Sequence, residues 1–282
     1  MGAMGSRAIT RHFAVAMLVL VTMAMLIAPL GQLLLVSLRD ESAGWTLANY
    51  RIVLAGSYYV GSLAATLAFC AITSLIAVGI ALPAAWRIGT GGAGSTALRI
   101  FCQMNYAFGS IVYGMLILVL FGNAGLIPVA EGILFSSEYS RGFAYTISGL
   151  ALGYLGFQIP RSALVIAQAI ENMDPNLIRA ARTLGADRLQ IAVMVILPTL
   201  RPALSAAFVL TFLMSVGSFG IALLVAKEIA IYPVIIFKEF TGFANFGIAS
   251  AMAITLCLLV ILVLMVLRRN YPDLELFSSQ AR

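Results

Sequence analysis

Long apolar segments without charged residues are the feature that most restricts how this chain can fold. Hydrophobic residues make up 62% of the 282 positions and charged residues only 10%, whereas soluble domains average about 25% charged residues. Water would not solvate such a surface, so the solvent for most of the chain must be a lipid bilayer. The length fits about six membrane spans of roughly 20 residues each, with connecting loops.

The gaps between charged residues set the positions of the spans. We place six spans, at Phe13–Leu38, Val60–Trp86, Ile100–Phe121, Ala144–Ile170, Ala203–Ala226 and Phe246–Leu267. Backbone amides in lipid must be hydrogen-bonded within their own segment, so each span is predicted to be a helix. The sequence thus predicts an all-α, polytopic membrane protein. Its transmembrane domain covers 13–270, between an N-terminal tail at 1–12 and a C-terminal tail at 271–282; Met1–Ser6 resembles a cloning remnant and is excluded from the fold.

The distribution of Lys and Arg predicts the orientation. With the N-terminus in the cytoplasm, the inside segments hold 12 of the 17 Lys and Arg residues, Arg161 included, and the outside loops hold 5. The acidic residues divide into 5 inside and 6 outside. Since cytoplasmic loops carry an excess of Lys and Arg, both termini are predicted to be cytoplasmic. Basic residues scattered among loops also argue against nucleic acid as a partner.

Several functional classes lack the residues that they need. The single histidine, His12, lies at a membrane edge without a second His or a Cys cluster, which argues against a metal site. None of the 11 carboxylates lies in a predicted span, although ion-coupled transporters usually keep ionisable groups at membrane depth. A secondary transporter or channel remains the alternative function, because sodium sites can be built from backbone carbonyls. The function of a membrane-embedded enzyme is poorly supported, because the sequence offers no nucleophile–base constellation.

The glycine-rich loop Gly89–Thr96 resembles a nucleotide-binding motif only superficially. Gly89, Gly91 and Gly94 match G-x-G-x-x-G, but a membrane helix precedes the loop instead of a strand. Ser95 stands where a P-loop needs its phosphate-binding lysine. We therefore interpret the loop as a flexible cytoplasmic connector, and the chain cannot be a P-loop ATPase by itself.

The polar segment 171–198 between the fourth and fifth spans has strong helix-end signals. Asp174 is a good N-cap and Pro175 a good first helical residue. Gly185 suits the position after a helix end, where a positive φ is usual. Asp187 can cap a second short helix that runs toward Pro198. The segment is thus predicted to be a cytoplasmic helix–Gly–helix, and it presents three cations to a partner, Arg179, Arg182 and Arg188.

At these residues the chain resembles the permease subunits of type I ABC importers. Their signature is Glu-Ala-Ala, three residues, Gly, nine residues, Ile, one residue and Leu-Pro. This chain matches it at Ala180-Ala181, Gly185, Leu197 and Pro198, with Val195 for Ile, whereas Arg179 replaces the signature Glu. The resemblance extends from Phe13 to about Arg269. Trp45–Tyr50, Phe121–Ile127 and Ser215–Phe219 look most like the branch that imports spermidine/putrescine, ferric iron and phosphonates.

The resemblance implies a non-catalytic subunit of a larger machine in the bacterial inner membrane. The implied partners are a second permease, homologous or identical, two cytoplasmic P-loop ATPase subunits and an extracytoplasmic solute-binding protein. ATP and Mg would bind to the ATPase subunits, and no cofactor is expected on this chain. The helix–Gly–helix corresponds to the family's coupling helix, which sits in a groove of the ATPase. The residues assigned to it are Asp174, Pro175, Arg179, Ala180, Ala181, Arg182, Gly185, Asp187, Arg188, Leu197 and Pro198.

Small residues in the middle of the fifth span predict part of the substrate pathway. We expect Ser215, Gly217, Ser218 and Phe219 to line a cavity near the membrane midplane, because Gly217–Gly220 can interrupt the helix and free backbone groups there. Ser218 stands where many relatives in the polyamine branch carry an acid, which argues against a polycationic substrate.

Two shorter patterns complete the prediction. Gly149, Gly153 and Gly156 form a small-residue face on the fourth span, which is expected to pack closely against another helix. Leu47–Ser57 is expected to form a short interfacial helix on the outer side, near the binding protein.

Overall fold

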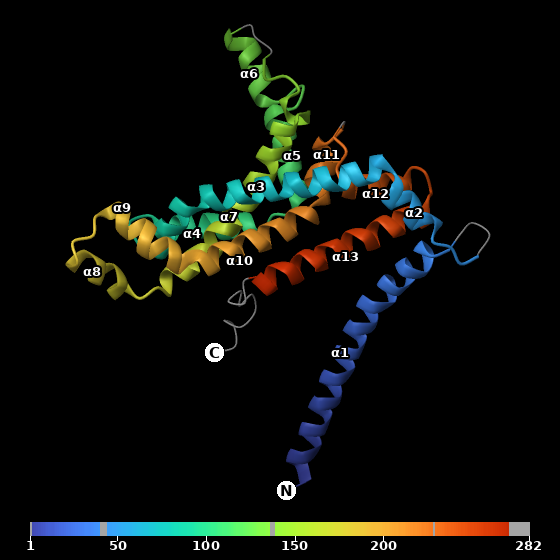
Figure 1. The fold of residues 1–282 in the computed structure, drawn as a ribbon, viewed down its shortest axis with the longest axis horizontal. Coiled ribbons are helices and arrows are strands. Elements are labelled where there is room, and N and C mark those ends of the chain that lie inside the picture. The colour runs from blue at the N-terminus through green and yellow to red at the C-terminus, as the bar shows by residue number, and fades with distance from the viewer. Residues whose placement is uncertain (1, 40–43, 136–138, 228, 271–282) are drawn as a thin grey trace. The chain divides into compact units, whose positions relative to one another are not determined.

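The computed structural model of the chain describes residues 2–39, 44–135, 139–227 and 229–270. Within these ranges the chain is helical, apart from loops and one isolated bridge between Arg39 and Trp45 (Figure 1). The helices, with η1 a 3-10 helix and η2 a π-helix, are α1 (Gly2–Ser37), α2 (Ala48–Ala55), α3 (Ser57–Gly89), α4 (Ser95–Ala107), α5 (Ser110–Phe121), α6 (Leu126–Phe135), η1 (Phe143–Tyr145), α7 (Ile147–Glu171), α8 (Pro175–Thr183), α9 (Arg188–Gln190), η2 (Ile191–Ile196), α10 (Leu197–Val216), α11 (Phe219–Val225), α12 (Tyr232–Thr241) and α13 (Phe246–Asn270).

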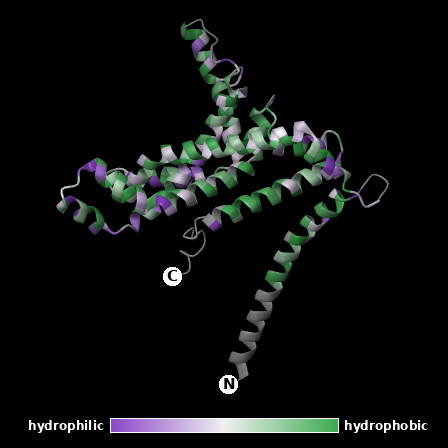
Figure 2. Ribbon diagram, in the orientation of Figure 1, coloured by the Kyte–Doolittle hydropathy of each residue, from purple (hydrophilic) through white to green (hydrophobic). Residues whose placement is uncertain are grey.

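Six stretches of these helices are long and apolar enough to cross a membrane, as the sequence predicted. They are Met17–Ser37, Ser57–Gly89, Ser110–Phe135, Ile147–Glu171, Arg188–Val216 and Phe246–Val266. Figure 2 shows how hydrophobic residues cover the long helices. Large apolar side chains face outward along them, such as Met25 at 77% exposure and Leu75 at 65%. A bilayer accepts such a surface, because lipid tails are as apolar as the side chains themselves.

The third span differs from its predicted bounds, Ile100–Phe121. The helix that begins at Ser95 ends at Ala107, and the backbone is extended at Phe108 and Gly109 before α5 begins. The apolar stretch then continues through α6 to Phe135. This stretch qualifies as a span by its length and composition, and it contains Glu131. The expectation that every carboxylate lies outside the spans is therefore wrong. The Glu131 carboxylate accepts hydrogen bonds from two neutral donors, the backbone N–H and the hydroxyl of Ser140.

The fifth span begins earlier and ends earlier than the predicted Ala203–Ala226. Helix runs without a break from Arg188 to Val216, through both Pro198 and Pro202. The π-turn η2 directly precedes Pro198: the N–H of Leu197 bonds to the carbonyl of Ala192, five residues back, and this shift in bonding brings the chain to a residue that has no N–H to donate. The helix stops at Gly217, and α11 starts afresh at Phe219. The predicted interruption of this span is therefore confirmed.

The chain divides into two compact units, which are described separately. Unit 1 comprises Met1–Val60 and Ile236–Leu258, and unit 2 comprises Gly61–Ile235 and Leu259–Arg282. Helix α1 begins at Gly2, so the predicted N-terminal tail 1–12 is helical from that residue on. The predicted C-terminal tail 271–282 lies outside the described residues.

In unit 1, the carboxylate of Glu239 holds together three segments. Its side chain is only 6% exposed. One oxygen accepts a 2.8 Å hydrogen bond from the hydroxyl of Tyr59, and the other accepts a 2.8 Å bond from the side-chain amide of Asn245. The start of α3, the helix α12 and the loop before α13 are thus joined at one buried acid.

In unit 2, α7 is buried on its glycine face. A Cβ atom on Gly153 would lie 3.1 Å from Ile221 and 3.3 Å from Ile117, and one on Gly156 would lie 3.3 Å from Tyr113. These contacts come from α5 and α11, which lie beside α7 (Figure 1). The prediction that the small residues of this span allow close helix packing is confirmed for Gly153 and Gly156.

Arg161 does not lie in a cytoplasmic segment, where the charge count placed it. It lies in the middle of α7 and is only 7% exposed. The count of cytoplasmic Lys and Arg residues included Arg161, although the predicted span Ala144–Ile170 contains that residue. Without it, 11 Lys and Arg residues remain inside against 5 outside, so the bias of charge keeps its sign.

Helices α5 and α11 cross so closely at Gly220 that a side chain there would meet backbone. A Cβ atom on Gly220 would lie 2.7 Å from the backbone nitrogen of Ile111 and 2.8 Å from the hydroxyl of Ser110. We expect Gly220→Ala to lower the free energy of unfolding by about 1–3 kcal/mol, because backbone must move to admit the methyl group. Gly79→Ala is the matched control, since nothing lies within 4 Å of a Cβ there. Thermal unfolding in detergent measures both, and equal melting temperatures would contradict the tight crossing.

Candidate functional site: the helix–Gly–helix segment and the polar face of α7

Helix α8 begins as its sequence predicts. Asp174 has an extended backbone, and its side chain accepts a 2.9 Å hydrogen bond from the N–H of Asn176. Pro175 is the first helical residue, where the missing N–H costs nothing. The predicted N-terminal cap of the segment is therefore confirmed.

The turn after α8 is a Schellman motif built on a glycine. Gly185 has a φ of +81°, and its N–H bonds to the carbonyl of Arg182 at 3.0 Å. The N–H of Ala186 bonds to the carbonyl of Ala181 at 3.1 Å. These two bonds satisfy the last carbonyls of the helix, and the left-handed conformation that they require suits glycine.

The second helix begins with a capping box. The side chain of Asp187 accepts a 2.6 Å bond from the N–H of Gln190, and the side chain of Gln190 accepts a 2.9 Å bond from the N–H of Asp187. Only Arg188–Gln190 is α-helical before the π-turn, which leads through Leu197 and Pro198 into α10. The second helix is thus the start of the fifth span instead of a separate element.

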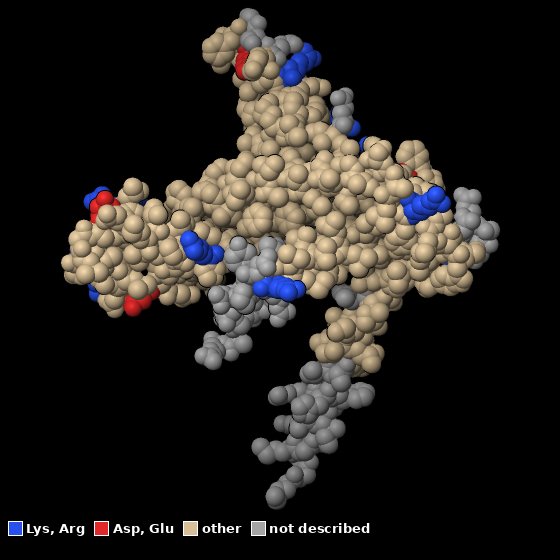
Figure 3. All heavy atoms as spheres, viewed as in Figure 1, with Lys and Arg blue, Asp and Glu red and all other residues tan. Residues whose placement is uncertain are grey.

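Together these elements expose a polar tip at one end of unit 2. No residue of α8 is buried, and Leu184 beside the turn is 87% exposed. The charged residues of the tip, Asp174, Arg179, Arg182, Asp187 and Arg188, are all exposed. Figure 3 shows basic and acidic side chains together at the end that carries α8 and α9. At the base of this tip, Arg99 of α4 forms an ion pair with Glu171, the last residue of α7. The helix ends inside the tip are capped by residues of the tip itself, so its exposed side chains can contact another molecule.

Inside the spans, one face of α7 carries polar groups. Tyr154, Gln158 and Arg161 follow one another at spacings of four and three residues, which places them on the same side of the helix. The hydroxyl of Tyr154 donates a 2.9 Å bond to the carbonyl of Ser218, and the amide of Gln158 donates to the hydroxyl of Ser215 and, at 3.3 Å, to that of Thr73. The polar face of α7 therefore holds the break between α10 and α11.

The four residues predicted to line the pathway all lie at this break. Gly217 is exposed and Phe219 is half-buried. Ser215 and Ser218 are only 1% and 4% exposed, so in this conformation their hydroxyls face protein and not an open cavity. Tyr154 and Gln158 cover them, and sequence reasoning had left these two partners out. The role of the four residues in transport stays a prediction.

Arg161 is a charged residue at the same face that sequence reasoning missed. Its guanidinium donates to the carbonyls of Phe157 at 2.6 Å, Tyr106 at 3.0 Å and Phe108 at 3.3 Å. It also lies 3.8 Å from the ring centre of Phe157 and 4.7 Å from that of Tyr106. Tyr106 and Phe108 flank the end of α4, so Arg161 fixes the corner between α4 and α5. An arginine inside a predicted span was the signal that could have found it.

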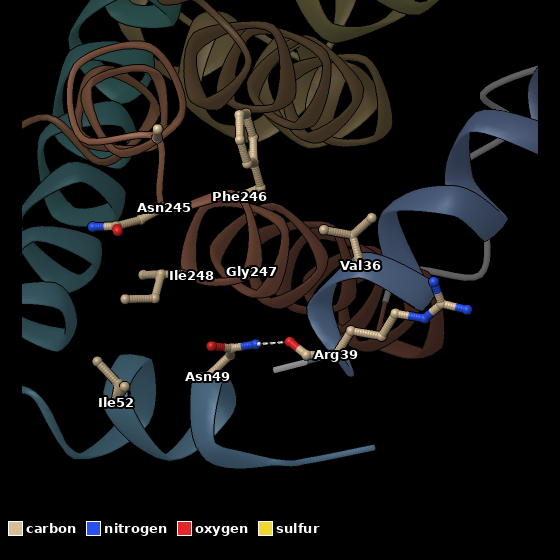
Figure 4. A pocket seen from close by; sticks show the side chains of 9 residues that line it. Val36, Arg39, Asn49, Ile52, Asn245, Phe246, Gly247 and Ile248 are labelled. Atoms are coloured by element: carbon tan, nitrogen blue, oxygen red, sulfur yellow. Dashed lines mark hydrogen bonds between the residues drawn. The ribbon is translucent and has the colours of Figure 1, made fainter. Parts of the chain in front are cut away.

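Unit 1 has a cavity of its own, of about 410 Å³, shown in Figure 4. Asn49 and Ile52 of α2 line it, together with Val36, Arg39 and residues 244–248, which are the end of the loop before α13 and the first turn of that helix. The side-chain amide of Asn49 bonds to the carbonyls of Ser37 and Arg39, both at 3.0 Å. Ala244 in this loop has a φ of +55°, which is uncommon for a residue with a side chain. Among the residues described, three His, Cys, Asp or Glu side chains do not gather anywhere as a metal site would require.

The comparisons with known proteins agree with this arrangement. Residues 77–274 match the family model described as binding-protein-dependent transport system inner membrane component. A sulfate transport system permease protein of Salmonella typhimurium is 31% identical over 164 residues, which cover 57% of each chain. A probable molybdenum ABC transporter permease protein of Haloferax volcanii is 28% identical over 193 residues, 68% of this chain and 67% of the relative. The chain thus spans little more than half the length of the sulfate permease that it matches.

Solved structures show the same fold. The bacterial ABC transporter involved in the import of the acidic polysaccharide alginate superimposes with a TM-score of 0.75 at 15% identity, over 95% of this chain and 98% of the other. The same kind of transporter in complex with an alginate pentasaccharide-bound periplasmic protein gives a TM-score of 0.73 at 14% identity. With six apolar spans and a family match over most of its length, the chain belongs to the inner membrane components of binding-protein-dependent transport systems, the permease subunits of ABC importers.

Proposed function

We propose that the chain forms, with a second permease, the translocation pathway of an ATP-driven importer that receives a small solute from a binding protein. The observation that carries this proposal is the exposed segment Asp174–Gln190, whose helix ends are capped from within. It joins α7 directly to α10, so a partner that displaces the segment also displaces both spans. Two cytoplasmic ATPase subunits are the partners that fit, one for each permease.

ATP and Mg belong on those partners. The loop Gly89–Thr96 is a tight connection between α3 and α4, and Arg87 closes it by donating a 2.7 Å bond to the carbonyl of Ala93. No lysine stands near it in the sequence to hold a phosphate. In this scheme both termini and the capped segment are cytoplasmic, and α2 with its cavity in unit 1 lies on the outer side, where the binding protein docks.

The substrate class that we favour is a small oxyanion. Sequence resemblance had suggested an importer of a polyamine, a phosphonate, iron or a similar solute, and the relatives found carry the names of sulfate, molybdenum and ferric transport. Neither α7 before Glu171 nor residues 188–226 contain an Asp or Glu. The side-chain groups at the helix break are the hydroxyls of Tyr154, Ser215 and Ser218 and the amide of Gln158. A polycation would find no counter-charge there, while an oxyanion would find hydrogen-bond donors.

Uptake into proteoliposomes tests the proposal. Vesicles containing this chain, its second permease, the ATPase subunits and the binding protein should accumulate radiolabelled sulfate or molybdate when ATP is supplied, and vesicles lacking this chain should not. Uptake that follows an ion gradient without ATP would overturn the proposal in favour of a secondary transporter. ATP-driven uptake of spermidine in place of the anions would reverse the substrate class alone.

Gly185 should be essential for coupling and not for folding. A leucine there meets no neighbour within 4 Å of its Cβ, but it must adopt a φ of +81°, at a cost of about 1–2 kcal/mol. We expect Gly185→Leu to insert normally and to lose most ATP-driven transport, because the turn that orients α8 relaxes. Gly185→Asn is the matched control, since asparagine tolerates this conformation. Wild-type transport by the leucine variant would sink the idea.

Arg179 should meet an acidic or neutral patch on the ATPase. Its side chain is exposed, and its one polar contact in the structure is a 3.5 Å contact with Asn176. Arg179→Glu should weaken assembly with the ATPase by at most about 1 kcal/mol, and salt should reduce the difference, because exposed ion pairs contribute little. Affinity measurements at two salt concentrations decide the question. Tighter binding of the Glu variant at low salt would show that the partner's charge has the opposite sign.

The helix break should open toward the pathway during transport. In a background without Cys70, Cys102 and Cys257, we expect Ser215→Cys and Ser218→Cys to react slowly with a hydrophilic thiol reagent in the conformation described. The rates should change when ATP is trapped on the assembled importer. Ser162→Cys, fully buried on α7, serves as the control for general loosening. If both cysteines stay unreactive in every state, the pathway lies elsewhere.

A further inference from the structure

An apolar groove of about 530 Å³ lies beside the capped segment in unit 2. Its walls come from α3, the end of α7, the helices α8 and α9, and the π-turn with the start of α10. Trp86, Ile178 and Ile196 are among the apolar residues that line it. The polar side chains in the lining are two arginines, Arg182 and Arg188, which stand on different helices.

Neither of the two arginines forms an ion pair with an acid among the described residues. Both are exposed, and no hydrogen bond or ion pair joins either guanidinium to another group in the described part of the chain. The three nearest carboxylates along the chain are engaged elsewhere. Glu171 pairs with Arg99, while Asp174 and Asp187 accept the N–H groups that begin α8 and α9. The groove therefore combines an apolar lining with two unpaired cations.

The position of the groove selects its occupant. Two of its walls, α3 and the helix that starts at Arg188, are membrane spans, and the groove lies at the ends of both. Trp86 is an aromatic residue of the kind that sits at headgroup depth. A molecule that fits must be apolar along its body and anionic at its head, at the edge of the bilayer. We propose that this groove binds an anionic phospholipid, with an acyl chain along the apolar lining and the phosphate between Arg182 and Arg188.

Arginine suits this task, because its planar guanidinium binds phosphate oxygens in a bidentate manner. Basic pockets between membrane helices on the cytoplasmic side are known to hold anionic headgroups. The inference goes beyond the coupling role. It assigns Arg182 and Arg188 to the lipid side of the segment, whereas Arg179 does not line the groove and stays available to the ATPase.

The intrinsic fluorescence of the chain provides the test. Trp45 and Trp86 are its two tryptophans, so W45F leaves Trp86 in the groove as the only reporter. The intact W45F chain is placed in phosphatidylcholine vesicles that contain brominated phosphatidylglycerol or, separately, brominated phosphatidylcholine. Bromine quenches a tryptophan that it contacts. We expect brominated phosphatidylglycerol to compete for the site about 30-fold better than brominated phosphatidylcholine, the selectivity that two membrane-surface arginines can supply at about 1 kcal/mol each.

The variant R182Q/R188Q in the same background should lose this selectivity. R201Q/R179Q, which removes the same charge from exposed positions outside the groove, should keep it. Equal quenching by the two lipids, or selectivity that survives R182Q/R188Q, would overturn the proposal. So would loss of selectivity on adding inorganic phosphate, because the arginines would then bind a free anion. The vesicles contain no ATPase, so the outcome does not depend on whether the coupling role is right.

Discussion

The burial of α7 on both of its faces is the constraint on which the rest of unit 2 depends. On one side, glycines let α5 and α11 approach within contact of the α7 backbone. On the other side, Tyr154, Gln158 and Arg161 bind the helix break, Thr73 and the corner after α4. Apolar burial alone does not hold helices together in lipid, so packing and interhelical hydrogen bonds must do so. The glycine face of α7 supplies the close packing, and its polar face supplies the interhelical hydrogen bonds.

Arg161 shows how hydrogen bonds and ring contacts can offset the cost of a charge inside a membrane span. An arginine at the centre of a span costs about 2.5–3.5 kcal/mol on insertion scales, and no carboxylate pairs with this one in the described residues. Hydrogen bonds to a charged group contribute about 1.5–3 kcal/mol each, and Arg161 makes three to carbonyls. Two aromatic rings add cation–π attraction. These contacts therefore offset the insertion cost of the arginine. In return, the carbonyls of Tyr106 and Phe108, at the corner where the helical bonding of α4 ends, gain a hydrogen-bond donor.

Sequence reasoning succeeded where the causes are local. The caps at Asp174 and Asp187 and the turn at Gly185 depend on neighbouring residues and backbone conformation, so their prediction was confirmed in detail. It failed where partners distant in the chain decide. The helix that runs through Pro198 depends on the π-turn before it, and the covering of Ser215 and Ser218 depends on side chains about 60 residues earlier. The place of Arg161 within its own span was visible in the sequence, but its partners on α4 were not.

The capped segment and the helix break are connected through rigid elements. From Gln158 to Glu171, α7 is unbroken, and at 1.5 Å per residue it spans about 20 Å. From Leu197 to Ser215, α10 spans about 27 Å in the same way. The two helices meet at the hydrogen bonds of Gln158 and Tyr154, and at their other ends the capped segment joins them. Under the proposed function, a partner that displaces α8 acts on α7 and α10 through the capped turn between them. The helical bonding of this pair is interrupted at Gly217, where shorter turn bonds, Ser218 to Ser215 and Phe219 to Gly217, replace the helical ladder, so the break is the place where the backbone can bend with least loss of hydrogen bonds.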